Sequence, residues 1–301
     1  MSNKSVDVEA VDVDLVAGMF EASLFLPSEN EYELKQHTIG NFELTLYSHP
    51  AASTDYDLTG IIVWPVSKLL SFYLVHKQQC LKDMFVLELG SGCGLPGLVA
   101  SSLQNCNEGF GERKNQTHGR VVLTDCEEEV LKVLSKNVKH QISLIPETTS
   151  FLTSEYLLWG NETEQIFEAA AFREKYTKVP DIFIAADVFH PSFGSPKQVF
   201  DTILLMSSST EKLKNMLRTK HDEETLPLEK KVEEKRKDIE LWVGFVDRGN
   251  MTEVLEASVV AGFAHKIVIL DEFVPEEFMK EVLSFSDRIL MIVVFTKTVY
   301  E

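Results

Sequence analysis

The sequence is poor in basic residues, in cysteine and in long apolar runs. Its 301 residues contain 29 Lys and Arg against 47 Asp and Glu, which gives a formal net charge of −18. General binding to nucleic acid through the phosphate backbone needs a basic surface, so this charge argues against a direct nucleic-acid partner. An acidic chain suits a basic protein partner, although it is also ordinary for a soluble cytosolic protein.

The 4 cysteines are Cys80, Cys93, Cys106 and Cys126, and they show neither a C-x-x-C spacing nor a paired histidine pattern. We therefore predict reduced thiols and no metal site. The acidic N-terminus lacks an apolar signal core, and no apolar run reaches membrane-spanning length. These features favour a cytoplasmic or nuclear protein without a membrane partner, and we expect a monomer.

The length and the hydrophobic content of 44% are sufficient for one large α/β domain with a full core. Residues 1–30 are acidic, and we expect them to be only partly ordered. The domain is then predicted over residues 31–301. A highly charged segment at about residues 207–237 is interpreted as an insertion, either a solvated loop or an extended helix.

Residues 85–97, FVLELGSGCGLPG, are the most informative stretch. The apolar run is typical of a strand that is buried on both faces of a parallel sheet. The glycines that follow allow a tight turn and a close approach of the backbone to a ligand. Residues 95–103 then predict a helix, with Pro96 in the first turn, where a missing N–H costs least.

Two ligands suit such a turn. Gly92, Gly94 and Gly97 fit the G-x-G-x-x-G pattern of a dinucleotide site, which alone is a weak signal. S-adenosyl-L-methionine (SAM) has no phosphate, so the glycines would let the backbone follow the shape of the ligand rather than bind a charge. Glu88 could then accept hydrogen bonds from the loop or counter the ammonium group of the ligand. A strand, turn and helix without any ligand is the third alternative.

The rest of the chain alternates between strand and helix patterns. Alternating residues at 32–39 and 42–47 around Gly40 predict a hairpin. Further strands are predicted at 120–125, 155–160, 180–187, 239–246, 265–270 and 289–296, and further helices at 66–76, 127–140, 161–176, 196–206, 252–261 and 275–285. The pattern predicts a Rossmann-like, doubly wound α/β sheet of seven strands with an N-terminal β-hairpin extension.

Ligands of an open parallel sheet bind beyond the carboxyl ends of its strands. The glycine turn follows a predicted strand, Asp125 and Asp187 each end one, and the three should gather there. Asp125 could accept both ribose hydroxyls of a nucleoside, or it could cap the next helix. Trp159 could cover an adenine ring, or it could belong to the core.

Five motifs follow one another along the chain: V-W-P at 63–65, V-L-E-L-G-S-G-C-G-L-P-G at 86–97, L-T-D at 123–125, L-W-G at 158–160 and A-D-V-F at 186–189. In this order they resemble the class I, seven-β-strand SAM-dependent methyltransferases, and among these the protein-lysine branch called methyltransferase family sixteen. The resemblance spans roughly residues 35–300. It implies methylation of proteins, mainly on lysine, with some relatives that act on arginine or histidine.

The resemblance also implies roles for individual residues. The implied contacts with the cofactor SAM are made by Trp64, Gly90, Ser91, Gly92, Asp125, Trp159 and Ala186. Asp187 would begin the D-x-x-Y/F signature beside the substrate amine. This chain departs from that signature at the fourth position, where His190 replaces the aromatic residue. An imidazole is smaller and titrates near neutrality, so it could change the accepted side chain or weaken turnover; a histidine before Pro191 is also common as a plain loop residue.

The sequence therefore predicts a SAM-dependent methyltransferase that acts on a side-chain nitrogen, most readily a lysine, of a basic protein. The methyl group already carries a sulfonium leaving group, so catalysis needs in-line placement and a neutral amine. Asp187, with His190 beside it, is the candidate catalytic group that orients the amine. The alternatives are a small-molecule methyltransferase, an NAD-binding oxidoreductase and a non-catalytic adaptor with the SAM fold.

Overall fold

The computed structural model describes residues 32–50, 56–105, 119–191, 194–221, 236–285 and 289–300. The predicted N-terminal segment 1–30 lies outside these ranges. Of the charged segment at 207–237, helix α8 (Thr210–His221) and the start of strand β7 (Arg236–Val246) are described. Residues 222–235 lie outside the described ranges.

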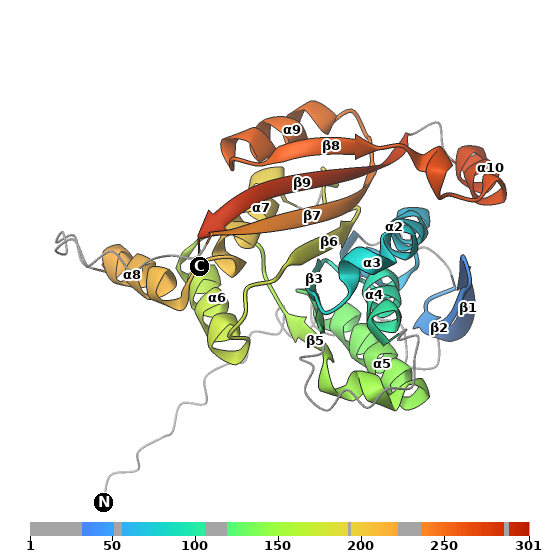
Figure 1. The fold of residues 1–301 in the computed structure, drawn as a ribbon, viewed down its shortest axis with the longest axis horizontal. Helices are drawn as coiled ribbons and strands as arrows, with labels where there is room; N and C mark the ends of the chain where they lie inside the picture. Colours follow the sequence, from blue (N-terminus) through green and yellow to red (C-terminus); the bar gives the residue numbers. More distant parts are fainter. Residues whose placement is uncertain are drawn as a thin grey trace, which may run out of the picture.

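A sheet of seven strands forms the centre of the molecule, in the order β5-β4-β3-β6-β7-β9-β8 (Figure 1). Besides β7, its strands are β3 (Phe85–Leu89), β4 (Arg120–Asp125), β5 (Leu152–Tyr156), β6 (Ile182–Ala186), β8 (Ala264–Val268) and β9 (Leu290–Tyr300). The strands from β5 to β7 are parallel, and β9 runs antiparallel to both β7 and β8. Strand order reverses at β3, which pairs with β4 on one side and β6 on the other. The doubly wound α/β fold is therefore confirmed, with its switch point beside the glycine turn.

Helices cover both faces of the sheet and define two hydrophobic clusters. One cluster includes α2 (Pro65–His76), α4 (Leu95–Asn105), α5 (Glu128–Leu144) and α10 (Glu276–Phe285), and the other includes α6 (Thr163–Lys175), α7 (Pro196–Met206), α8 and α9 (Met251–Val260). The short elements are α3 (Gln78–Leu81), η2 (Tyr56–Ile61), η3 (Pro146–Ser150) and η4 (Leu270–Glu272). Within β3, Val86 belongs to the first cluster and Leu87 to the second, as the two-residue period of a strand requires.

The predicted N-terminal hairpin is confirmed. Strands β1 (Glu33–Ile39) and β2 (Phe42–Ser48) pair antiparallel around Gly40, whose φ of 60° suits a tight turn. Asn137 on α5 fastens the hairpin: its Oδ1 accepts the N–H of Tyr47 at 2.6 Å, and its Nδ2 donates to the carbonyls of Tyr47 and Cys93, both at 2.9 Å. One buried amide therefore joins the hairpin to the glycine turn.

The third core strand lies earlier than the sequence pattern predicts. Residues 155–160 were expected to form it, but β5 covers Leu152–Tyr156. Its pairing ends with Tyr156 opposite Asp125, because Asp125 is the last residue of β4. Trp159 consequently lies beyond the strand, at the carboxyl edge of the sheet.

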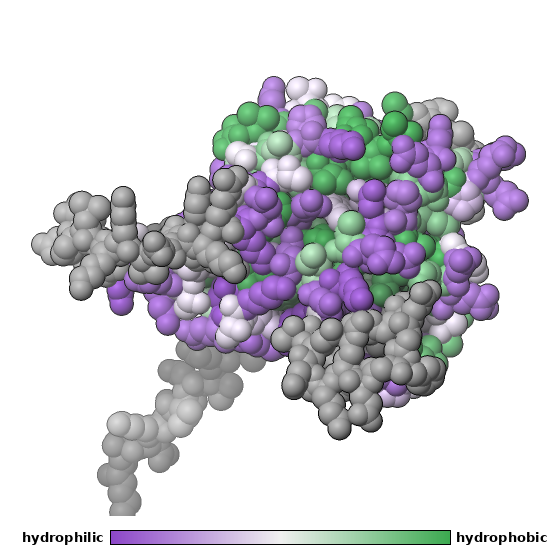
Figure 2. All heavy atoms as spheres, in the orientation of Figure 1, coloured by the Kyte–Doolittle hydropathy of each residue, from purple (hydrophilic) through white to green (hydrophobic). Residues whose placement is uncertain are grey.

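The surface in Figure 2 is largely hydrophilic, with apolar side chains gathered over α9 and β8. Exposed apolar residues in this region include Val259, Val260, Ile267 and Ile269. They belong to the far edge of the sheet, where β8 pairs only with β9 among the described strands. None of the helices within the described ranges is both long and apolar enough to cross a bilayer.

Candidate functional site

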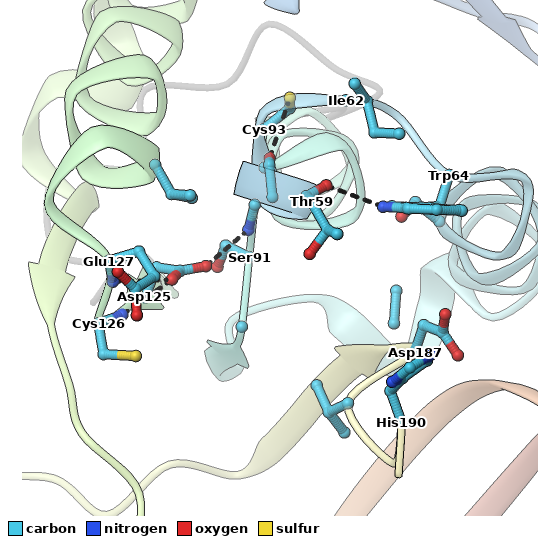
Figure 3. Close-up of a pocket in the computed structure, with 18 of the residues that line it drawn as sticks. Thr59, Ile62, Trp64, Ser91, Cys93, Asp125, Cys126, Glu127, Asp187 and His190 are labelled. Atoms are coloured by element: carbon cyan, nitrogen blue, oxygen red, sulfur yellow. Dashed lines mark hydrogen bonds between the residues drawn. The ribbon is translucent and has the colours of Figure 1, made fainter. Parts of the chain in front are cut away.

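A cavity of about 600 Å³ lies at the carboxyl ends of β3, β4 and β6 (Figure 3). Its wall contains nine of the ten residues that the sequence singles out: Trp64, Gly90, Ser91, Gly92, Asp125, Trp159, Ala186, Asp187 and His190. The sheet topology thus brings together residues from five separate motifs. Glu88 is not among the described residues on this wall.

The glycine turn requires glycine at two positions for identifiable reasons. Gly90 has a φ of 59°, and a Cβ there would lie 3.0 Å from the ring of Trp159. Gly92 has a φ of 55°, and a Cβ there would lie 2.9 Å from the carbonyl oxygen of Gly60. Left-handed backbone and close packing therefore coincide, and both favour a residue without a side chain.

Asp125 closes the turn from the neighbouring strand. Its Oδ2 accepts the N–H of Gly92 at 3.0 Å, and its Oδ1 accepts the N–H groups of Cys126 at 2.8 Å and Glu127 at 3.2 Å. Burial raises the pKa of this carboxyl, while the three amide hydrogen bonds act in the opposite direction. The N-cap of α5 is Glu127, so Asp125 precedes the helix rather than capping it.

Glu88 is buried behind the glycine turn and is hydrogen-bonded to it. Its side chain is 1% exposed, and its Oε2 accepts the N–H of Gly97 at 3.2 Å. Burial raises its pKa to about 8, and hydrogen bonds with Ser91 and Gly97 oppose that shift. Of the two roles that the sequence leaves open for Glu88, the structure therefore shows the loop contact, and a ligand in the cavity would not reach its carboxyl.

Two tryptophans flank the cavity. Trp64 precedes α2, and its Nε1 donates to the carbonyl of Thr59 at 2.9 Å, as Figure 3 shows. Trp159 follows β5 and packs against the glycine turn at Gly90. Both rings offer apolar surface next to polar backbone, which suits a planar base or an aliphatic chain.

Asp187 follows β6 in a left-handed conformation, with a φ of 60°. Its N–H donates to the carbonyl of Gly244 at 2.9 Å, which fixes the turn against β7. A non-glycine residue in this region is strained, and such strain is often found at functional turns. His190 lies on the same loop and on the cavity wall.

Arg248 is the functional candidate that sequence reasoning missed. Its Nη1 and Nη2 donate to Oδ1 and Oδ2 of Asp187, each at 2.6 Å. Asn250, two residues further on, donates from Nδ2 to the carbonyl of Phe189 at 2.7 Å. The loop after β7 therefore holds the loop after β6 at two points. The only signal for Arg248 in the sequence is a charged residue shortly after a buried strand.

The arrangement suits a nucleoside without a phosphate. The N–H of Gly92, which a pyrophosphate would need, already donates to Asp125. A phosphate at the turn would also lie against that carboxylate, whereas a hydroxyl group could donate to the lone pair of Oδ2 that remains free. Within the described ranges, no group of three or more His, Cys, Asp and Glu side chains is placed to hold a metal ion.

Comparisons with known proteins identify the family of the chain. Residues 52–225, more than half of the chain, match the family model described as lysine methyltransferase. Protein-lysine N-methyltransferase EEF2KMT from Mus musculus is 26% identical over 190 residues, which cover 60% of this chain and 51% of the relative. The Homo sapiens protein of the same name is also 26% identical, over 60% of this chain and 52% of its own length.

A third relative is the protein N-terminal and lysine N-methyltransferase EFM7 from Cryptococcus neoformans. It is 26% identical over 192 residues, which cover 63% of this chain and 56% of the relative. The chain therefore spans about half the length of the relatives that it matches.

Proposed function

The chain belongs to the lysine methyltransferase family, and from that premise we propose that it is a SAM-dependent enzyme that methylates a lysine side chain of a protein. The observation that supports this best is the hydrogen bond from Gly92 to Asp125 inside the cavity. It places the carboxylate of Asp125 directly against the glycine turn. A carboxylate there can accept a hydrogen bond from a ribose hydroxyl and attract a cationic ligand.

The nucleoside would bind at the end of the cavity formed by Asp125, Trp159 and the turn at 90–92. Asp125 accepts one ribose hydroxyl at Oδ2, because its three backbone donors leave one lone-pair site free there. Trp159 offers a ring face to the base, and Ala186 leaves room beside it. When bound, SAM supplies a methyl group on a sulfonium sulfur, which is a good leaving group.

The acceptor amine would enter at the end formed by Asp187, His190 and Trp64. Asp187 orients the amine and takes up its proton, directly or through water. Trp64 excludes water, and polar contacts are stronger in a site of lower dielectric constant. His190, in place of the aromatic residue of the family signature, adds a second group that can carry a proton.

The net charge of −18 supports a basic protein as the substrate, because opposite charge speeds up encounter. We include in the proposal a monomeric enzyme in the cytoplasm or the nucleus. The reaction needs no membrane and no nucleic acid.

Incubation of the purified protein with methyl-labelled SAM and a cell extract tests this function. We expect label on lysine in one or a few proteins with the wild type and none with Asp187→Ala. Label on arginine or histidine would contradict lysine as the acceptor but would still support a protein methyltransferase. Label only in small molecules would contradict a protein substrate, and binding of NAD without binding of SAM would contradict the methyltransferase itself.

A further inference from the structure

Asp187 already has a cationic partner within the protein. Both of its oxygens accept hydrogen bonds from the guanidinium of Arg248 at 2.6 Å, and each of the two side chains is 12% exposed. A bidentate, charge-assisted pair of this kind is among the strong hydrogen-bonding arrangements for a carboxylate. A protonated amine that enters the cavity therefore meets a carboxylate whose charge is already balanced.

One N–H group of Arg248 has no hydrogen-bond acceptor among the described residues. Its Nε is buried and donates to no acceptor in the part of the chain that the structure describes. Apart from Asp187, its Nη1 reaches the carbonyl of Val246 at 3.3 Å. A buried donor without an acceptor destabilises the structure that contains it. Because Arg248 is part of the cavity wall, a bound molecule could supply the missing acceptor.

An amine can replace the guanidinium on Asp187 only if Arg248 finds another anion. Breaking a buried ion pair without replacement is strongly destabilising, because it leaves a buried charge unpaired. The other acids on the described wall are Asp125 and Glu127, which Figure 3 places across the cavity from Asp187. Asp125 is also bound to three backbone amides there. The second anion therefore has to come from the substrate.

We propose that Arg248 is a specificity-determining residue that binds a carboxylate of the substrate, so that the accepted lysine is one with an acidic side chain beside it. This inference rests on the proposed function and narrows its substrate class. On binding, the guanidinium turns from Asp187 to the substrate carboxylate, and the amine takes its place on Asp187. Every buried charge then keeps a partner, whereas a lysine with neutral neighbours leaves Arg248 unpaired.

Peptides with a single lysine in a neutral sequence test the proposal. One set carries a single glutamate, moved through the positions around the lysine, and the matched set carries glutamine at the same positions. Binding to the protein loaded with S-adenosylhomocysteine is measured by calorimetry, and methyl transfer is measured with labelled SAM. We expect the best glutamate peptide to bind about tenfold more tightly than its glutamine counterpart, a difference of about 1.4 kcal/mol.

The same peptides are then given to Arg248→Gln, to Arg248→Lys and to the control Arg218→Gln, which changes an exposed arginine on α8. We expect the preference to disappear in Arg248→Gln, to be partly restored in Arg248→Lys and to be unchanged in Arg218→Gln. Equal binding of both peptide sets by the wild type would overturn the proposal, as would a preference that survives in Arg248→Gln. The double variant Asp187→Asn/Arg248→Gln removes both charges together, so it leaves no buried charge unpaired. If the unfolding midpoint of Arg248→Gln lies well below that of the wild type, the same binding measurement is made on the double variant, and a preference for glutamate that survives there also overturns the proposal.

Failure of this inference can be distinguished from failure of the proposed function. If lysine peptides are methylated equally well with glutamate or glutamine beside the lysine, the proposed function is supported and the proposed role of Arg248 is wrong. If SAM binds and no peptide or protein is methylated, the proposed function is wrong. In that case calorimetry with the peptides still reports whether Arg248 selects a carboxylate.

Discussion

The two ends of the cavity hold the same type of residue in different ways. Asp125 is the last residue of β4 and Asp187 follows β6, so both acids lie at the carboxyl edge of the sheet. Three backbone amides hold Asp125, whereas the guanidinium of Arg248 holds Asp187. Amides orient a carboxylate and leave its charge in place, but a guanidinium also neutralises it. On the proposed roles, the nucleoside end is therefore preformed, whereas the acceptor end would have to exchange a partner before it binds an amine.

The largest effect is expected from Asp187→Asn. The amide keeps the size of the side chain but can neither attract an ammonium group nor take up its proton, so methyl transfer should fall about thousandfold. SAM affinity should stay at the wild-type value, because Asp187 is assigned to the acceptor end. Single-turnover transfer from labelled SAM and calorimetric titration with SAM measure the two quantities. A loss of SAM affinity equal to the loss of transfer would remove the distinction between the two ends.

Substitutions at two glycines, one at each end of the cavity, should lower the stability of the fold by different amounts. Gly92→Ala places a Cβ 2.9 Å from a backbone oxygen at a φ of 55°, while Gly249→Ala, beside Arg248, meets nothing within 4 Å at a φ of 86°. We expect Gly92→Ala to lower the free energy of unfolding by about 3 kcal/mol and Gly249→Ala by about 1 kcal/mol. Urea unfolding of both variants tests this. Equal losses would mean that the turn at Gly92 is not tightly packed.

A smaller effect is expected from Asp125→Asn. The side-chain amide has one oxygen in place of two, so it cannot accept all three backbone hydrogen bonds and a ribose hydroxyl as well. We expect SAM affinity to fall about tenfold, the equivalent of one hydrogen bond to a charged group at about 1.5 kcal/mol. Calorimetry measures this, with Asp187→Asn as the matched control. Unchanged affinity in Asp125→Asn would contradict ribose binding at this end.

The most gradual effect is expected at Glu88, a buried acid behind the turn, because it is spread over several pH units. Burial raises its pKa from 4.5 to about 8, so the folded protein retains a proton that the unfolded chain releases. The resulting stability is fully present below pH 4.5 and is lost as pH rises towards 8. The free energy of unfolding should fall across that window by at most about 1.4 kcal/mol per pH unit.

Glu88→Gln cannot titrate, so this part of the pH dependence should be absent from it. Urea unfolding of both proteins across the window measures the difference in slope. Parallel curves for the wild type and Glu88→Gln would show that the carboxyl is ionised in the folded protein.

The nucleoside end was predictable because its signals are local. An apolar run, four glycines and a strand that ends in Asp125 place the turn and the carboxylate without knowledge of distant contacts. The same reasoning placed Asp187, since its strand is equally apolar. The predicted limits of the third core strand were wrong because the apolar run continues through L-L-W, beyond the end of β5 at Tyr156. Only the pairing with β4 shows where the strand ends.

Only one residue of the ion pair at the acceptor end, Asp187, was predictable, because Arg248 is far from it in the sequence. Arg248 is 61 residues away from Asp187 and lies in D-R-G-N, a sequence typical of an exposed turn. No local pattern indicates that this guanidinium turns inward. The role of Glu88 was undecided for a similar reason, since its contact with Gly97 depends on how α4 packs behind the turn.

Calorimetric titration of the wild-type protein with SAM and with NAD, side by side, is the most direct test of a cavity shaped for a nucleoside without phosphate. The account predicts saturable heat with SAM and none with NAD, because the Gly92 amide is already bound to Asp125. Binding of NAD at least as tight as that of SAM, or no heat with SAM, would contradict it.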